Sequence, residues 1–152
     1  MRRFVFVSVI CLFCSSCSYF LDPMLYVRTP TIAFSSLDDL RIYVVHNIKY
    51  KSDPPEYWQA PQETIDKGTG DCEDFAILVA YFAREMGYDV MLVGITTTNG
   101  NHMIVSINGV CYEAQSVTPY KGTINVIARF TLDDALRICY NRYGSRSVYE
   151  SL

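Results

Sequence analysis

The chain has 152 residues, of which 50% are hydrophobic and 19% are charged. This is the composition of one compact globular domain, and it excludes a disordered or fibrous chain. The formal net charge of -3 at pH 7 leaves no basic surplus for a phosphate backbone, so we expect no nucleic-acid partner.

The first 17 residues predict a signal peptide, because two arginines at positions 2 and 3 precede an apolar run at 4–13. That run is too short for a membrane-spanning helix, which requires roughly twenty residues. The small residues before Cys17 resemble the lipobox of bacterial lipoproteins, which implies lipidation of Cys17. Cys14 stands where that motif usually has an aliphatic residue, so a plain signal peptide is the alternative. We therefore expect an exported protein of the cell envelope or periplasm, held to a membrane through lipid on Cys17.

The rest of the chain divides into a tether at 18–34 and a folded domain at 35–152. Within the domain, apolar residues at helical spacing and capping residues indicate helices, whereas short apolar runs rich in strand formers indicate strands. The predicted helices cover 37–49, 61–67, 72–86 and 131–140, and the predicted strands cover 90–95, 102–107, 110–114 and 123–130. Residues 142–152 are predicted to form a polar tail.

These elements predict an α+β fold. Apolar residues nearly surround the helix at 72–86, so we expect it to be the buried central helix. Asn108-Gly109 separates two strand-like runs and predicts a tight antiparallel hairpin. The expected architecture is a central helix carrying Cys72, packed on a small antiparallel sheet.

Cys72 is the candidate nucleophile, because it opens the central helix. Unpaired backbone N–H groups and the helix dipole favour an anion there. The flanking Asp71, Glu73 and Asp74 oppose this effect by like-charge repulsion, so a thiolate at this position needs a cationic partner. After removal of the cysteines up to position 17, an odd number is left (Cys72, Cys111 and Cys139). An odd cysteine in an exported protein indicates a free, reactive thiol or an intermolecular bridge.

His102 is the candidate base, since it begins a strand directly after a turn. A two-residue turn at 108–109 pairs residue 107 with 110 and residue 104 with 113. Glu113 then lies on the same face of the hairpin as His102, two residues from direct register. A carboxylate at this distance can hold the imidazole in the tautomer that a catalytic triad requires.

The segment from Trp58 to Gln115 resembles the bacterial transglutaminase-like superfamily of papain-fold cysteine enzymes. The resemblance is carried by Gly70-Asp71-Cys72-Glu73-Asp74-Phe75-Ala76, Asn101-His102 and Tyr112-Glu113-Ala114-Gln115. It implies a papain-like fold with Cys72 as nucleophile, His102 as base and Glu113 as acid. It also implies an oxyanion site formed by the Cys72 N–H and an upstream donor, for which the candidates are Trp58, Gln59 and Gln62. Some members bind calcium beside the cysteine, where this chain has Asp71 and Glu73, although two carboxylates do not make a site of six to eight oxygens.

The resulting hypothesis is a cysteine peptidase or acyltransferase that acts on a protein or peptide and requires no cofactor, calcium being compatible. One alternative is an inactive envelope binding module that retains the fold. A second is a zinc site formed by Cys72, His102 and Cys111, for which the spacings are poor. Cys111 and Cys139 are expected to be packing residues or to form a disulfide.

Overall fold

The computed structural model describes residues 30–52 and 57–149, and only the backbone of residues 142–149. The predicted signal peptide and Cys17 lie outside these residues. The described elements, in chain order, are α1 (Leu37–Asn47), β1 (Lys49–Tyr50), α2 (Pro61–Lys67), β2 (Thr69–Gly70), α3 (Cys72–Glu85), β3 (Val90–Thr97), β4 (Gly100–Ile107), β5 (Val110–Glu113), β6 (Thr118–Pro119), β7 (Asn125–Phe130) and α4 (Leu132–Tyr149). The predicted α+β class is therefore confirmed.

The main sheet is antiparallel, with strand order β6-β5-β4-β3-β7. Asn108 and Gly109 connect β4 to β5 with φ values of 48° and 80°, as a tight hairpin turn of the predicted kind requires. The predicted register is confirmed at the turn, where Ile107 pairs with Val110, and Val105 pairs with Tyr112 further along. This hairpin is the element that brings residues 102 and 113 to the same part of the sheet.

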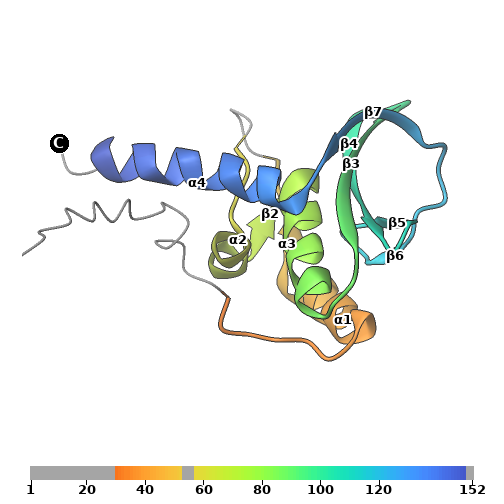
Figure 1. The fold of residues 1–152 in the computed structure, drawn as a ribbon, viewed down its shortest axis with the longest axis horizontal. Helices are drawn as coiled ribbons and strands as arrows, with labels where there is room; N and C mark the ends of the chain where they lie inside the picture. The colour runs from red at the N-terminus through yellow and green to blue at the C-terminus, as the bar shows by residue number, and fades with distance from the viewer. Residues whose placement is uncertain (1–29, 53–56, 150–152) are drawn as a thin grey trace, which may run out of the picture.

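Helix α3 packs against one face of the sheet, as Figure 1 shows. Its residues from Phe75 to Ala80 are buried, and they share one hydrophobic core with Val105 and Ile107 of β4. The opposite face carries a smaller cluster built on Val93, Ile95 and Ile104. The two faces alternate along β4 because successive side chains of a strand point to opposite sides.

Helix α4 crosses one end of α3 (Figure 1) and buries Ala135, Leu136 and Cys139. The polar tail predicted from residue 142 is wrong for the backbone, which continues as helix to Tyr149. The helix starts with a Thr131 side chain that accepts the Asp134 N–H at 3.1 Å, and extending an existing helix costs much less than starting one. No helix within the described ranges is both long and apolar enough to span a bilayer.

A second, two-stranded sheet was not predicted. β1 and β2 run parallel, with Lys49 paired to Thr69 and Tyr50 paired to Gly70. The predicted first helix therefore ends at Asn47 rather than near Lys49. Two-residue strands carry no period-2 pattern, so the sequence gives no sign of this sheet.

Candidate active site

Cys72 is the first residue of α3, and its thiol is bonded to a neighbouring carboxylate. Sγ donates to Oε2 of Glu73 across 3.0 Å. Burial, the hydrogen bond to Glu73 and the charge of that carboxylate raise the pKa of the Cys72 thiol to about 12. In this arrangement the thiol is protonated at neutral pH.

A backbone contact places the same thiol against strand β4. A hydrogen bond from the Met103 backbone opposes the rise in the Cys72 pKa, as expected for an N–H that points at the sulfur. The pairing of β4 with β5 reaches only to Val105 and Tyr112 at this end. The open edge of β4 beyond that pair is therefore where the thiol approaches the sheet, one residue from His102.

His102 and Glu113 are in direct contact across the hairpin. Nε2 of His102 lies 2.9 Å from Oε2 of Glu113, and the Gln115 N–H lies 3.5 Å from the other carboxylate oxygen. Burial raises the pKa of the Glu113 carboxyl, but the hydrogen bond and charge of His102 lower it, and the net pKa lies below its ordinary value. Because Nε2 faces the carboxylate, Nδ1 is the ring nitrogen that is left for a second partner.

The imidazole belongs to the face of β4 that turns away from α3. Strand alternation puts His102 with Ile104, whereas Met103 and Val105 face the helix. The His102 ring lies beside Tyr120, with ring centroids 6.5 Å apart. His102 and Glu113, two of the three predicted triad residues, are thus in direct contact. The Cys72 thiol contacts the backbone of Met103, the residue next to His102.

A cavity of about 450 Å³ opens beside the imidazole. Its walls combine the His102–Glu113 pair with two tyrosines and a polar turn. The lining residues are Tyr50, Thr97, Thr98, Asn99, Asn101, His102, Glu113 and Tyr120. Hydroxyl and carboxamide groups dominate this surface, so it suits a ligand that offers hydrogen-bonding groups.

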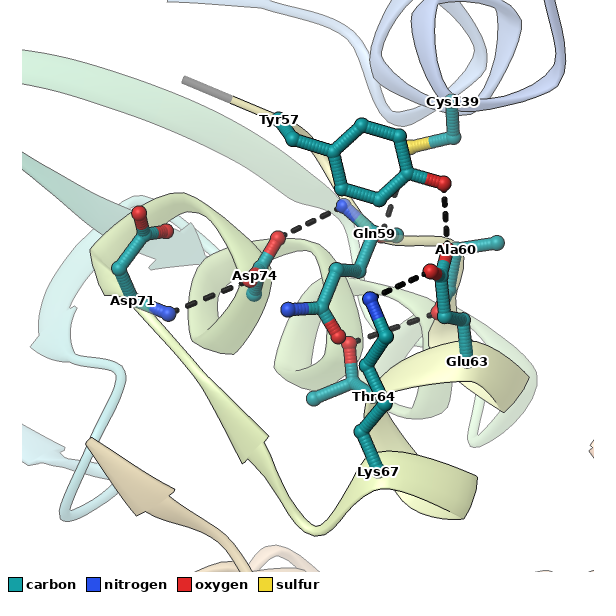
Figure 2. A network of polar contacts seen from close by, with 9 residues as sticks. All are labelled: Tyr57, Gln59, Ala60, Glu63, Thr64, Lys67, Asp71, Asp74 and Cys139. Atoms are coloured by element: carbon teal, nitrogen blue, oxygen red, sulfur yellow. Dashed lines mark hydrogen bonds and ion pairs between the residues drawn. The ribbon is translucent and has the colours of Figure 1, made fainter. Parts of the chain in front are cut away.

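Two of the three candidate oxyanion residues, Trp58 and Gln59, lie on a short segment, residues 57–60, which we call the strap (Figure 2). The Gln59 N–H donates to Oδ1 of Asp74 across 2.7 Å, and the Gln59 carbonyl accepts from the Cys139 thiol across 3.4 Å. At its other end, Tyr57 donates to Glu63 across 2.9 Å. The strap is therefore held by contacts with three helices, two to its backbone at Gln59 and one to the Tyr57 side chain.

The three candidate donors differ in their surroundings. The Trp58 ring packs edge-on against Phe130, with centroids 5.2 Å apart. The Gln59 side chain is buried, and within the described part of the chain its Oε1 has no hydrogen-bond partner, which is also true of Oε1 of Gln62. Gln62 lies on α2 and its amide donates to Asp66 across 2.6 Å. Of the three, Gln59 has the buried carboxamide with the least satisfied hydrogen-bonding capacity.

Asp74 is a structural centre of this site that the sequence did not single out. Its carboxylate is fully buried and accepts the backbone N–H groups of Gln59 and Asp71, the latter across 3.2 Å. Gly70 provides the space that the Asp74 side chain occupies, because a Cβ at position 70 would lie 2.6 Å from Cβ of Asp74. An acid at the third helical position, after a glycine, was the available indication, because such acids commonly cap the preceding turn.

The described residues offer little to a metal. Asp71 and Glu73 are both buried, but no group of three His, Cys, Asp or Glu side chains suited to a metal ion occurs in the described ranges. The predicted calcium ligands therefore supply only part of a six-to-eight-oxygen shell. The zinc alternative has no site among the described residues, because Cys111 lies in the smaller cluster on the opposite face of the sheet from α3, the helix that begins with Cys72.

Cys111 and Cys139 do not form a disulfide. Neither sulfur is part of a disulfide in the structure. Cys139 is buried in the main core with α3, whereas Cys111 packs on the opposite face of the sheet. The alternative expectation, that they are packing residues, describes their positions.

A cysteine at the start of a buried helix, packed on an antiparallel sheet that carries histidine and a carboxylate, defines the papain-like class of folds. Within that class, the chain belongs to the transglutaminase-like superfamily, whose sequence model matches residues 26–122, more than half of the chain. The resemblance seen in the sequence is thereby confirmed. A comparison with curated proteins gave no match.

Solved structures share the fold at low sequence identity. LapG of Legionella pneumophila and its calcium-bound form each superpose with a TM-score of 0.53 at 22% identity, covering 62% of this chain. A candidate cysteine protease from Cytophaga hutchinsonii gives a TM-score of 0.50 at 20% identity, covering 62% of this chain and 35% of the other. The match spans 62% to 63% of these LapG chains, less than two thirds of their length.

Proposed function

We propose that this protein is a cysteine peptidase in which Cys72 is the nucleophile, His102 the base and Glu113 the orienting acid. The observation that carries the proposal is the 2.9 Å contact between His102 and Glu113, one residue along β4 from the backbone that meets the thiol. The proposed substrate is a protein or peptide of the cell envelope. Export and lipidation of Cys17 are parts of the same proposal.

In the proposed reaction, Glu113 accepts a hydrogen bond from the Nε2–H group of His102. Nδ1 of His102 then takes the proton of the Cys72 thiol. The thiolate attacks the amide carbon and forms a C–S bond, and the imidazolium returns the proton to the leaving amine. Water then attacks the acyl-enzyme with the imidazole as base, which releases the acid and restores the thiol. Acyl transfer differs only in that an amine replaces water.

The hydrogen bond between the Cys72 thiol and Glu73 must break, and the thiol must reach His102, before this reaction begins. A thiol whose pKa is about 12 is thiolate in only about one molecule in 100,000 at pH 7. Rotation of the Cys72 side chain away from Glu73 would let the sulfur turn toward the imidazole. Catalytic hydrogen bonds often tighten only when substrate binds, so the resting geometry is compatible with this exchange.

The Cys72 N–H and a donor from the strap are the proposed oxyanion site, with Gln59 and Trp58 as the donors to compare. Substituting Gln59→Leu removes the carboxamide, whereas Trp58→Phe removes the indole N–H and keeps an aromatic ring against Phe130. The variant that loses acylation rate identifies the donor. Loss of one oxyanion donor costs about a hundredfold or more in rate.

Calcium is compatible with the family but carries no step of this proposal. A calcium-bound form of LapG is known among the structural neighbours. Here Asp71 and Glu73 could contribute two carboxylates, and the described residues do not complete the shell. We propose a reaction that requires no cofactor.

Intact-mass analysis tests the proposal. A peptide chloromethyl ketone should add once to the wild-type protein, at Cys72, because the sulfur displaces chloride and forms a thioether. The adduct should be absent in Cys72→Ser, slowed at least about tenfold in His102→Ala, and unchanged in the control Cys111→Ser. The same spectrum reports any lipid on Cys17.

The raised pKa of the thiol favours one other function, an inactive binding module that retains the fold. In that case Cys72 would react no faster with the peptide reagent than with a small alkylating agent. His102→Ala would then leave both rates unchanged, which would contradict the peptidase.

A further inference from the structure

Tyr50 is held next to the nucleophile by the small parallel sheet. β1 pairs Tyr50 with Gly70, and the Lys51 N–H donates to the Gly70 carbonyl across 2.8 Å. β2 then continues through Asp71 directly into Cys72. The backbone of Tyr50 is therefore fixed opposite the residue two positions before the thiol.

The Tyr50 side chain also borders the histidine side of the site. It lines the cavity that contains His102 and Glu113, and it is 56% exposed. Burial raises the pKa of Tyr50, and electrostatic interactions with Cys72, Asp71 and Glu73 raise it further, as expected for a phenol near the start of α3. One side chain thus adjoins both halves of the proposed catalytic machinery.

Tyr50 has no evident structural duty that would explain this position. Its ring is not part of either hydrophobic core, and its hydroxyl makes no hydrogen bond within the residues that the structure describes. Tyrosine combines an apolar ring with a polar tip, and such side chains are enriched where proteins bind partners. The neutral polar wall formed by Thr97, Asn99 and Asn101 suits the amide groups of a peptide backbone.

We propose that Tyr50 is a substrate-contacting residue, whose ring packs on the bound peptide and whose hydroxyl donates to a backbone carbonyl of that peptide. This inference rests on the proposed peptidase function and adds a residue to it. Tyr50 takes no part in the proton transfers, so its effect falls on peptide binding and leaves the intrinsic reactivity of Cys72 unchanged.

Two chloromethyl ketones separate these contributions. Chloroacetone reports the reactivity of the thiol, and a dipeptidyl chloromethyl ketone adds the binding of a peptide to the same chemistry. Four dipeptidyl reagents, ending in Gly, Ala, Gln or Phe, are compared on the wild type and the fastest is used. The measured quantity is the ratio of the two second-order rate constants at Cys72, with kinact and KI resolved for the peptide reagent.

We expect Tyr50→Ala to lower this ratio at least about fivefold, the loss typical of an aromatic contact residue. Tyr50→Phe removes one hydrogen bond and should lower it about two- to tenfold. Both changes should appear in KI, with kinact and the chloroacetone rate within about twofold of the wild type, the spread expected when no contact is lost. Lys49→Ala is the matched control, because Lys49 is exposed on the same strand and its side chain points to the other side.

A ratio in Tyr50→Ala equal to that of the wild type would overturn the inference and leave the peptidase proposal intact. A wild type that reacts no faster with any dipeptidyl reagent than with chloroacetone would also overturn it, because the cleft would then give a peptide no binding energy. Failure of the triad itself is recognised separately, by rates that do not change in His102→Ala. Thermal unfolding of Tyr50→Ala checks that this exposed site leaves the fold unchanged.

Discussion

Replacing Glu73 by glutamine should activate the Cys72 thiol. The Glu73 carboxylate accepts a hydrogen bond from the Cys72 thiol across 3.0 Å, and this hydrogen bond and the charge of Glu73 rank after burial among the causes that raise the thiol pKa to about 12. Glutamine keeps the size of the side chain and removes the charge. The pKa of Cys72 should therefore fall, and more thiolate should form at every pH below it.

The magnitude follows from the type of bond that is lost. A hydrogen bond to a charged group contributes about 1.5–3 kcal/mol, which corresponds to about one to two pKa units. Because part of the Cys72 side chain is exposed, solvent screening reduces the effect toward the lower end of this range. We expect Glu73→Gln to raise the rate of alkylation by iodoacetamide about tenfold between pH 7 and pH 9.

The assay is the rate of iodoacetamide addition at Cys72 as a function of pH, measured by mass spectrometry. The wild-type rate should rise tenfold for each pH unit across this window, since the thiol pKa lies above it. Glu85→Gln is the matched control, because Glu85 is exposed at the other end of α3. An alkylation rate in Glu73→Gln within twofold of the wild type would refute the conclusion that Glu73 keeps the thiol protonated.

Three further predictions concern the surroundings of the thiol. Gly70→Ala should lower the melting temperature by several degrees, because the new Cβ would lie 2.6 Å from Cβ of Asp74 and overpacking typically costs about 1–3 kcal/mol of stability. An unchanged melting temperature would show that the backbone around residue 70 shifts to accommodate the methyl group. The lowered pKa of Glu113 stabilises the fold above the unfolded-state pKa of this carboxyl and ceases to do so as the pH falls through the folded-state value. Urea unfolding from pH 6 to pH 3 should therefore show a smaller loss of stability in Glu113→Gln than in the wild type, and equal losses would contradict the pairing with His102. Gln59→Leu should lower the rate at which a dipeptidyl p-nitrophenyl ester acylates Cys72 about a hundredfold, and an unaltered acylation rate would remove Gln59 from the oxyanion site.

The fold around the thiol could be predicted because each element carries a local pattern. The buried helix α3 follows from its unbroken apolar residues, and the β4–β5 hairpin follows from Asn108-Gly109. The hairpin register then places Glu113 within reach of His102, and the structure has this contact at 2.9 Å. The catalytic roles of these residues remain predictions.

The remaining features depend on contacts that leave no local pattern. The sequence indicated only that Glu73 would repel a thiolate, whereas in the structure its carboxylate accepts a hydrogen bond from the Cys72 thiol. The strap is held by Asp74, which lies 15 residues from Gln59 along the chain. β1 and β2 are too short for periodicity to reveal, so the sequence did not show that Tyr50 pairs with Gly70, two residues before Cys72.

The hydrogen bond from the Cys139 thiol to the Gln59 carbonyl has a consequence for the order in which the chain folds during its synthesis. These residues are 80 positions apart, so a growing chain carries Cys72, His102 and Glu113 well before it contains the helix that secures the strap. On the ribosome, and during any passage through a membrane in extended form, the strap lacks its C-terminal support. The strap therefore reaches its final support only after α4 has been made, and the surroundings of Cys72 are complete only when folding of the chain is nearly finished.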